Sequence, residues 1–310
     1  FMLSFIVIAY FIQVSFGQIT SFTNQIEKGA DLSTNAPEVE LDTNKFIVLN
    51  FDDSHKSQFT YGKPILDKYG FKATFFLVCD WIGSDSGEDE KMTWSDTAKL
   101  HAEGHDIEAH TMTHPHLNKL SSSELEYEIS QSKQCLLDHG INSTIFAYPY
   151  GEVWDDPEVF NIVSKYYDLA RSNSETPLTF LNNNNISDHY FFSKSPDNDM
   201  FVDRYAINSW SHRHIEGDYS TSERECEGSC IYYNTSQMLQ KFIEIVNSQD
   251  KYNTNGRIGA IPIIVYHTIV NFPDLLDSTR PVDVTVDLFE KEMKYLSDNN
   301  FKVLLLSDLR

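Results

Sequence analysis

Two acidic residues and two histidines have types and spacings that could hold a metal ion. Asp52 and Asp53 directly follow an apolar run, and neighbouring carboxylates in one turn repel each other unless a cation offsets their charge. His110 and His114 lie four residues apart in one expected turn, so both imidazoles can face the same point. Imidazole and carboxylate together form a common metal-ligand set. Taken alone, the Asp-Asp-Ser string is more typical of a turn or a helix cap than of a metal site.

Two other segments offer groups for the chemistry of a carbonyl substrate. The Pro-Gly turn in Tyr148-Pro149-Tyr150-Gly151 can leave a backbone N–H pointing into a pocket, as stabilisation of an oxyanion requires. His267 follows a strongly apolar run, where a general acid would lie if that run were a barrel strand. A lone histidine there is also typical of a core residue, and a Pro-Gly string is typical of any turn.

The elements that position these residues alternate in type from residue 45 onward. Short apolar runs rich in Val, Ile and Phe are KFIVLNF, FKATFFLV, STIFAY, AIPIIVYH and FKVLLL. Helical patterns between and around them span about 57–69, 93–103, 121–139, 156–165, 235–249 and 285–299. This alternation predicts an α/β fold of parallel strands and crossover helices, whose chemistry collects at the carboxyl ends of the strands. Residues 173–235 lose the regularity, and we expect them to form an elaborated insertion.

The amino-terminal segment predicts export. Residues 1–17 carry no charge and end in small residues, which is typical of a signal peptide, with an N-terminal anchor as the alternative. Polar residues 18–44 are interpreted as a linker. We therefore expect the rest of the chain to be secreted or held at the cell surface.

Export would make the four cysteines potential disulfide partners. Cys226 and Cys230 are close enough in sequence to suggest a local bridge. Cys79 lies in an apolar run and Cys135 in a helical pattern, so we expect these two to be buried free thiols.

The charge balance excludes one class of partner. The 310 residues include 24 Lys and Arg against 46 Asp and Glu, which gives a formal net charge of -22. Such a field repels the phosphate backbone of nucleic acids, and it disfavours anionic membrane surfaces, so we expect membrane association only through an N-terminal anchor. The sequence does not indicate an oligomeric state.

The strings FDD, HTMTHP, YPYG and VYH occur in this order at successive expected strand ends. Over residues 45–310 this order resembles the polysaccharide deacetylases of carbohydrate esterase family four. The segments LDKYGFKATFFLV and LHAEGHDIEAHT are similar to that family as well. The resemblance implies a single catalytic domain, a distorted (β/α) barrel of about seven parallel strands, and hydrolysis of N-acetyl groups, which are linear amides, on amino sugars.

The resemblance also implies a role for each motif residue. By position, Asp53, His110 and His114 look like the ligands of one divalent metal ion, with zinc expected first and cobalt, nickel or iron as alternatives. Asp52 beside them looks like the general base, and His267 looks like the general acid.

The remaining motif residues are expected to contact the substrate, an N-acetylated glycan. The backbone N–H of Tyr150 looks like the oxyanion donor, with Pro149 and Tyr150 lining the substrate site. Trp210, and as an alternative Trp81, could form an apolar wall for the acetyl methyl group or simply pack in the core.

Two departures from the family pattern matter. Members commonly have Arg where this chain has Ala147, and Gly where it has Ser54. The missing Arg would orient and charge-balance the base, so another cation should replace it. Arg204 follows a short apolar stretch that we interpret as a late barrel strand, and we place it provisionally in the catalytic set, with a surface pair to Asp203 as the alternative.

Two other functions stay open at this level. The absence of Arg at position 147 favours a glycan-binding protein on a weakened deacetylase fold, whereas the presence of the ligands, base and acid opposes it. A related metal amidohydrolase acting on a small amide would need the same chemistry.

Overall fold

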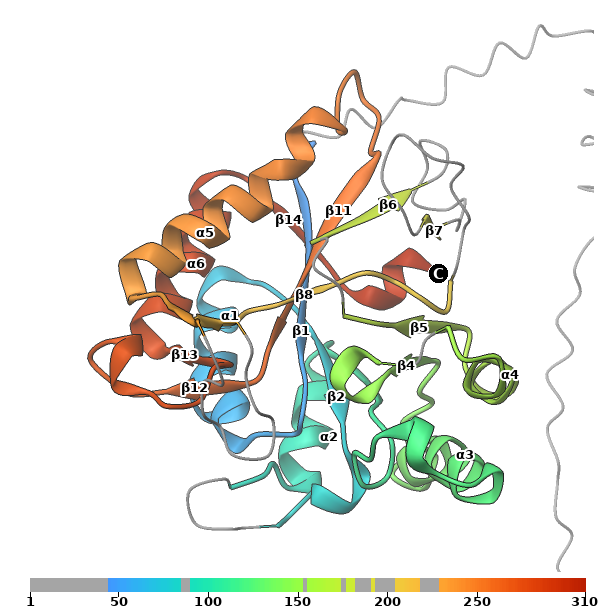
Figure 1. The fold of residues 1–310 in the computed structure, drawn as a ribbon. Helices are drawn as coiled ribbons and strands as arrows, with labels where there is room; N and C mark the ends of the chain where they lie inside the picture. The colour runs from blue at the N-terminus through green and yellow to red at the C-terminus, as the bar shows by residue number, and fades with distance from the viewer. Residues whose placement is uncertain are drawn as a thin grey trace, which may run out of the picture. The chain divides into compact units, whose positions relative to one another are not determined.

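Strand β1 (Phe46–Phe51) lies at the centre of the fold, and all six of its residues are buried. It pairs in parallel with β11 (Ala260–Tyr266) along one edge. Along its other edge, its first half pairs with β14 (Lys302–Leu304) and its second half with β2 (Thr74–Leu77), as Figure 1 shows. A strand covered on both faces is mostly apolar, which explains why Asn50 is the one polar residue in this run.

The structure is a computed structural model that describes residues 44–84, 90–152, 155–173, 177–181, 191–192, 204–217 and 229–310. Leu41–Arg310 form one compact unit. The further strands are β3 (Asp106–Ala109), β4 (Ile145–Ala147), β5 (Leu169–Arg171), β6 (Leu178–Leu181), β7 (Phe191–Phe192), β8 (Trp210–Ser211), β9 (Ile215–Glu216), β10 (Ile231–Tyr232), β12 (Thr268–Val270) and β13 (Asp283–Thr285).

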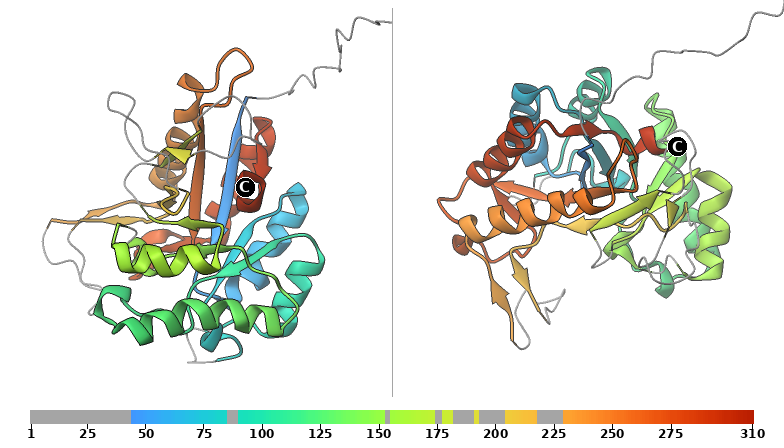
Figure 2. Two further views of the ribbon diagram at one scale, coloured as in Figure 1. Left: turned by 90° about the vertical axis from the view of Figure 1, so that its right-hand side faces the viewer. Right: turned by 90° about the horizontal axis from the view of Figure 1, so that it is seen from above.

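The helices occupy the connections between these strands. The α-helices are α1 (Lys63–Tyr69), α2 (Trp94–Ala102), α3 (Ser122–Asp138), α4 (Pro157–Tyr166), α5 (Thr235–Asn247) and α6 (Val286–Asp298). The short helical turns are η2 (Gln58–Gly62), η3 (Cys79–Trp81), η4 (Leu117–Lys119), η5 (Pro149–Gly151), η6 (Ser248–Lys251), η7 (Leu275–Asp277) and η8 (Leu306–Leu309). The α-helices lie outside the strands, with α5 and α6 on one flank and α3 and α4 on another (Figures 1 and 2).

The strands close into a ring. Strands β1 to β5 pair in parallel in chain order. Arg171 of β5 then pairs in parallel with Ile207, and the backbone N–H of Ser172 donates to the carbonyl of Ile207 at 2.9 Å. The same segment continues into β8, which pairs in parallel with β11. Since β11 returns to β1, seven parallel strands form the ring, and the expected distorted (β/α) barrel is confirmed.

The two faces of the strands fill two different cores. Alternate residues of β1 such as Phe46 and Val48 belong to a buried cluster inside the ring, which also contains Ile145 and Ile263. The intervening residues, such as Leu49, pack outward into the larger cluster beneath the helices. This period of two is the signature of a strand with a core on each side, and it directs the side chain of Asp52 toward the interior.

The segment 173–235, expected as an insertion, contributes to the barrel itself. Its residues 207–211 join β5 to β11 and so close the ring. The expectation was wrong for this stretch, because a strand of two residues leaves no detectable apolar run. Strands β6 and β7 extend the sheet antiparallel from β11, and much of the remaining segment lies outside the described residues.

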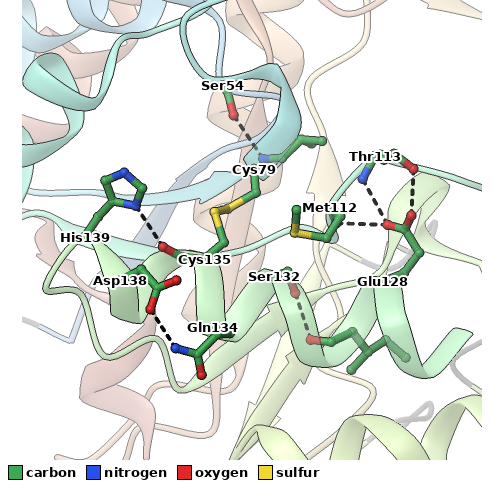
Figure 3. The surroundings of a disulfide bond; sticks show 12 residues. Ser54, Cys79, Met112, Thr113, Glu128, Ser132, Gln134, Cys135, Asp138 and His139 are labelled. Atoms are coloured by element: carbon green, nitrogen blue, oxygen red, sulfur yellow. Dashed lines mark hydrogen bonds between the residues drawn. A yellow bond between two sulfur atoms is a disulfide. The ribbon is translucent and has the colours of Figure 1, made fainter. Parts of the chain in front are cut away.

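A disulfide joins Cys79 to Cys135 (Figure 3). The expectation of two free thiols was therefore wrong. Cys79 begins η3 directly after β2, and α3 lies against that turn with the two Cα atoms 6.6 Å apart. Cys226 lies outside the described residues, so its pairing with Cys230 stays a prediction.

The amino-terminal segments expected as a signal peptide or anchor (1–17) and as a linker (18–44) lie outside the described residues, apart from Asn44. In the described part of the chain, no helix combines the length and the apolar character that crossing a membrane would require.

Replacing both Cys79 and Cys135 by Ser should lower the free energy of unfolding. The disulfide closes a loop with a sequence separation of 56 residues, and such a loop restricts the unfolded chain. We expect a loss of about 2–4 kcal/mol, measured by urea unfolding at equilibrium. Reduction of the unchanged protein should produce a similar loss, and an unaltered unfolding midpoint in the double variant would contradict the role.

Candidate active site

The turn after β1 brings both carboxylates to one pocket. The backbone N–H of Asp52 continues the ladder to β11 by donating to the carbonyl of Tyr266 at 3.0 Å. Asp53 and Ser54 then adopt the left-handed conformation, with φ of 70° and 58°. The hydroxyl of Ser54 accepts the N–H of Val78 at 3.0 Å, which ties the turn to the end of β2. Ser54, which stands where the family commonly has Gly, is therefore a buried structural contact.

A carboxylate from α3 holds the turn that carries the histidines. Glu128, which is buried, accepts the backbone N–H groups of Met112 and Thr113 at 2.9 Å each (Figure 3). Its other oxygen accepts the hydroxyl of Thr113 at 2.7 Å. These bonds satisfy the backbone between His110 and His114, and so they fix how the two imidazoles converge. Reasoning from the sequence did not single out Glu128.

One atom from each of Asp53, His110 and His114 lies within 4.8 Å of the others. The Oδ1 atom of Asp53 is 3.6 Å from Nε2 of His110 and 3.5 Å from Nε2 of His114. Two ligands of one tetrahedral zinc ion are separated by about 3.4 Å, given bonds of about 2.0–2.2 Å. The same oxygen is buried and has no hydrogen-bond partner among the described residues. This donor set therefore fits one divalent metal ion.

The charge states of these groups suit metal binding. Burial, reinforced by the neighbouring His114, lowers the pKa of His110 to about 3, so its ring is neutral. Its Nδ1 contacts the carbonyl oxygen of Ala147 at 2.8 Å, which leaves Nε2 facing Asp53. Burial opposes ionisation of Asp53, yet the imidazoles of His55 and His114 hold its pKa well below the usual range. An ionised carboxylate and neutral imidazoles are the forms that coordinate metals.

The cation beside Asp52 is Arg171. Its Nη2 donates to Oδ2 of Asp52 at 2.5 Å, and both side chains are almost fully buried. Arg171 ends β5, and the pairing of β4 with β5 places it directly opposite Ala147. The guanidinium missing at position 147 is thus supplied from the neighbouring strand.

The provisional placement of Arg204 in the site was wrong. The side chain of Arg204 is exposed, and only its backbone carbonyl contacts the barrel, where it accepts the N–H of Ala170 at 2.9 Å. The signal that would have found Arg171 is weak: a basic residue at the end of the short run Leu169–Arg171, directly after a helical pattern.

His267 faces the same pocket from the end of β11. Burial lowers its pKa to about 4, against the opposing attraction of Asp53 and Asp52. Its Nδ1 is buried without a hydrogen-bond partner among the described residues. The buried amide of Gln58 donates to the backbone carbonyls of both Asp52 and His267, and so it fastens the ends of β1 and β11 to each other. Gln58 is a second positioning residue that the motifs did not reveal.

Tyr150 covers the mouth of the site. It has φ of 60°, and its ring lies 4.6 Å from that of His114 and 4.0 Å from that of His116, measured between centroids. Its hydroxyl donates to the backbone carbonyl of His114 at 3.3 Å. Pro149 is buried and is absent from the described pocket wall, so its expected contact with substrate is not supported by the geometry.

The pocket has a volume of about 190 Å³. Its wall includes Asp52, Asp53, His110, His114, Tyr150, Arg171 and His267. The ring of Trp81 lies 5.3 Å from that of His114. Trp210 instead lines an adjoining cavity, so the expected apolar wall beside the metal ligands is not formed by Trp210.

Residues in the left-handed backbone region gather at this pocket. Seven described residues other than glycine have positive φ, and five of them belong to the three turns of the site: Asp53, Ser54, Thr111, His114 and Tyr150. The other two, Asn255 and Asn300, are of a type that tolerates this conformation. Strain of this kind persists only where surrounding structure enforces it, and it is typical of functional sites.

Part of this site lies in a range of the chain that matches a known family model. Residues 41–166, which hold all three candidate metal ligands and Asp52, match the family model described as polysaccharide deacetylase. Over this range the chain is similar to the polysaccharide deacetylases. Arg171 and His267 lie beyond the matched range.

Curated relatives share about a third of the aligned residues with this chain. The peptidoglycan-N-acetylglucosamine deacetylase PgdA of Listeria monocytogenes is 31% identical over 46% of this chain and 29% of its own length. The chitooligosaccharide deacetylase of Azorhizobium caulinodans is 32% identical over 38% of this chain and 53% of its own length. The chain thus spans at most about half the length of these curated relatives. A family 4 carbohydrate esterase of Streptomyces lividans superposes with a TM-score of 0.48 at 15% identity, covering 86% of this chain and 94% of that one.

Replacing Glu128 by Gln should weaken metal binding without removing a ligand. The amide loses one acceptor from the turn between the histidines, and loss of such a supporting contact typically costs about tenfold to a hundredfold in metal affinity. A chelator competition titration with zinc measures this change. Asp53→Asn should lose more affinity than Glu128→Gln.

The matched control is Glu126→Gln on the same helix, whose side chain pairs with Lys165 and Tyr166 away from the turn. This variant should keep its zinc affinity. Equal zinc affinities in Glu128→Gln and Glu126→Gln would contradict the supporting role of Glu128.

Proposed function

We propose that residues 45–310 form a metal-dependent hydrolase that removes N-acetyl groups from amino-sugar polymers or oligomers. The observation that carries this proposal is the convergence of Asp52, Asp53, His110, His114 and His267 on one small pocket. The match of residues 41–166 to the polysaccharide deacetylase family model supports the reaction class. The names of the relatives support peptidoglycan or chitooligosaccharide as the kind of substrate.

The proposed cofactor is one divalent ion held by Asp53, His110 and His114, with zinc expected first. When bound, such an ion polarises the acetyl carbonyl and lowers the pKa of a water molecule to about 7. Two imidazoles and one carboxylate leave coordination positions open, as a catalytic site requires.

Asp52 is the proposed general base. Arg171 holds Oδ2 of its carboxylate, while Oδ1 is buried without a hydrogen-bond partner among the described residues. One oxygen is therefore fixed and the other is open to accept a proton from the attacking water. The ion pair orients the base without occupying the atom that reacts. Arg171 is accordingly a positioning residue.

Tyr150 and His267 are proposed to act on the carbonyl oxygen and on the nitrogen of the amide, respectively. The backbone N–H of Tyr150 would stabilise the oxyanion that forms as water adds to the carbonyl. His267 would donate a proton to the departing amine nitrogen, which otherwise leaves as a very unstable anion. Burial lowers the pKa of His267 to about 4 in the pocket without substrate, so the proton that Asp52 takes from the attacking water would have to pass to His267 before it reaches the amine nitrogen.

The ion pair of Asp52 also bears on the competing proposals. The absence of Arg at position 147 favoured a glycan-binding protein on a weakened fold, but Arg171 now supplies the missing contact. Export of the chain remains a proposal, and the Cys79–Cys135 disulfide supports it because such bonds persist in oxidising compartments.

Zinc-loaded protein should release acetate from oligomers of N-acetylglucosamine. Asp52→Asn and His267→Ala should each lower turnover by at least about a hundredfold while retaining the metal, the usual scale for loss of a general acid or base. Acetate assays together with elemental analysis measure both quantities. Release from small cyclic amides in place of the oligomers would favour the amidohydrolase, and binding of the oligomers without release would favour the glycan-binding protein.

Replacing Arg171 by Met should depress turnover and destabilise the fold. The variant leaves the buried carboxylate of Asp52 unpaired, which typically costs about 3–5 kcal/mol in unfolding free energy. The double variant Arg171→Met with Asp52→Asn should regain part of this stability, because the uncompensated charge is gone.

A second test, Ala147→Arg with Arg171→Ala, moves the guanidinium across to the facing position on β4 and should recover part of the turnover. Wild-type turnover in Arg171→Met would refute the role.

A further inference from the structure

A larger cavity of about 670 Å³ adjoins the proposed active-site pocket. The two hollows share part of their walls, formed by Asn173, Ser211 and Arg213. The larger one also contains Trp210, Glu216 and Lys241. Its volume falls in the range of about 300–1,000 Å³ that is typical of ligand sites. A glycan whose acetylated residue lies in the smaller pocket can therefore extend into this cavity.

Most charge in the larger cavity is already neutralised. Lys241 forms an ion pair with Glu216, and the hydroxyl of Tyr233 donates to the same carboxylate at 2.9 Å. The ammonium of Lys241 lies 5.7 Å from the ring centroid of Trp210. These contacts lock the lysine against the cavity wall and leave it little excess charge to offer a ligand.

Arg213 differs from Lys241 because it forms no direct ion pair with Glu216, although its charge still helps to lower the pKa of that carboxyl. Among the residues that the structure describes, no carboxylate lies within ion-pair distance of its guanidinium, and its half-buried side chain lines both hollows. Its backbone is held on both sides, because the N–H of His212 donates to Val265 and that of His214 donates to Pro281, each at 2.8 Å. A half-buried arginine on a held backbone at the junction of two cavities can offer its guanidinium to an anion.

We propose that Arg213 binds a carboxylate on the sugar residue that occupies the larger cavity, so that the preferred substrates are acidic N-acetylated glycans. This inference rests on the proposed function of the adjoining pocket. A guanidinium matches a carboxylate with two parallel hydrogen bonds, which adds direction as well as strength. The net charge of -22 repels an acidic polymer at long range, but this repulsion is screened beyond about 8 Å at physiological salt. At contact distance, the attraction between Arg213 and the carboxylate of the glycan therefore dominates.

The test compares matched substrates on the zinc-loaded protein. One is an oligomer that alternates N-acetylglucosamine with N-acetylmuramic acid, and the other is the same oligomer with its lactyl carboxylates converted to methyl esters. We expect Arg213→Gln to lower the ratio of kcat/KM between the acidic and the esterified oligomer by about tenfold to a hundredfold, mainly through KM. The control Arg310→Gln removes the same charge at the amino end of β4, where Arg310 contacts Thr144, and should leave the ratio unchanged. An unchanged ratio in Arg213→Gln would overturn the proposal.

A binding measurement separates this inference from the proposed function. Calorimetry of the metal-free protein with the acidic oligomer should show an affinity that falls about tenfold or more in Arg213→Gln and not in Arg310→Gln. Binding that depends on Arg213, without acetate release from any oligomer, would support the anion site and reject the deacetylase. Acetate release together with equal oligomer affinities in Arg213→Gln and Arg310→Gln would support the deacetylase and reject the anion site.

Discussion

The buried ion pair between Asp52 and Arg171 joins two strands that are not neighbours in the ring. β1 and β5 are separated by β2, β3 and β4 along one side, so the pair spans the interior of the barrel at the carboxyl ends of its strands. Neither group could remain charged there alone, because an unpaired buried charge costs several kcal/mol. The base of the proposed reaction is therefore also a structural element. Any sequence that keeps Asp52 must supply a cation to this point.

The other constraint on the site is conformational. The turns after β1, β3 and β4 each contain residues in the left-handed region, and each presents a group to the same pocket. Such turns are unfavourable in isolation, and they are held here by buried contacts from outside the turn: Gln58 and the N–H of Val78 at the first turn, and Glu128 at the second. The site thus depends on helices that contribute no reacting group. Its precision comes from α3 and η2 as much as from the strands.

The sequence predicted those features that are local. The alternation of apolar runs and helical patterns predicted the parallel strands and crossover helices, and the order of the motifs, through the family that they resemble, predicted the barrel and the group Asp53, His110 and His114. Arg171 was missed because it acts through strand register: only the pairing of β4 with β5 shows that it lies opposite Ala147. The Cys79–Cys135 bond was missed for the same reason, since it depends on how α3 packs. Short strands such as β5 and β8 bury too few residues to leave a pattern.

The pairing of β1 carries a consequence for how the protein is made. This strand is among the earliest of the folded unit to leave the ribosome, yet two of its three partners, β11 and β14, are separated from it by more than two hundred residues. Until these strands emerge, one edge of β1 and half of the other have no backbone partner. A nascent chain therefore carries a mostly apolar strand without its backbone partners through most of its synthesis, which makes premature association with other chains a hazard. Folding is completed late and by long-range contacts, a regime that is slow and that favours protection of the chain by chaperones during translation.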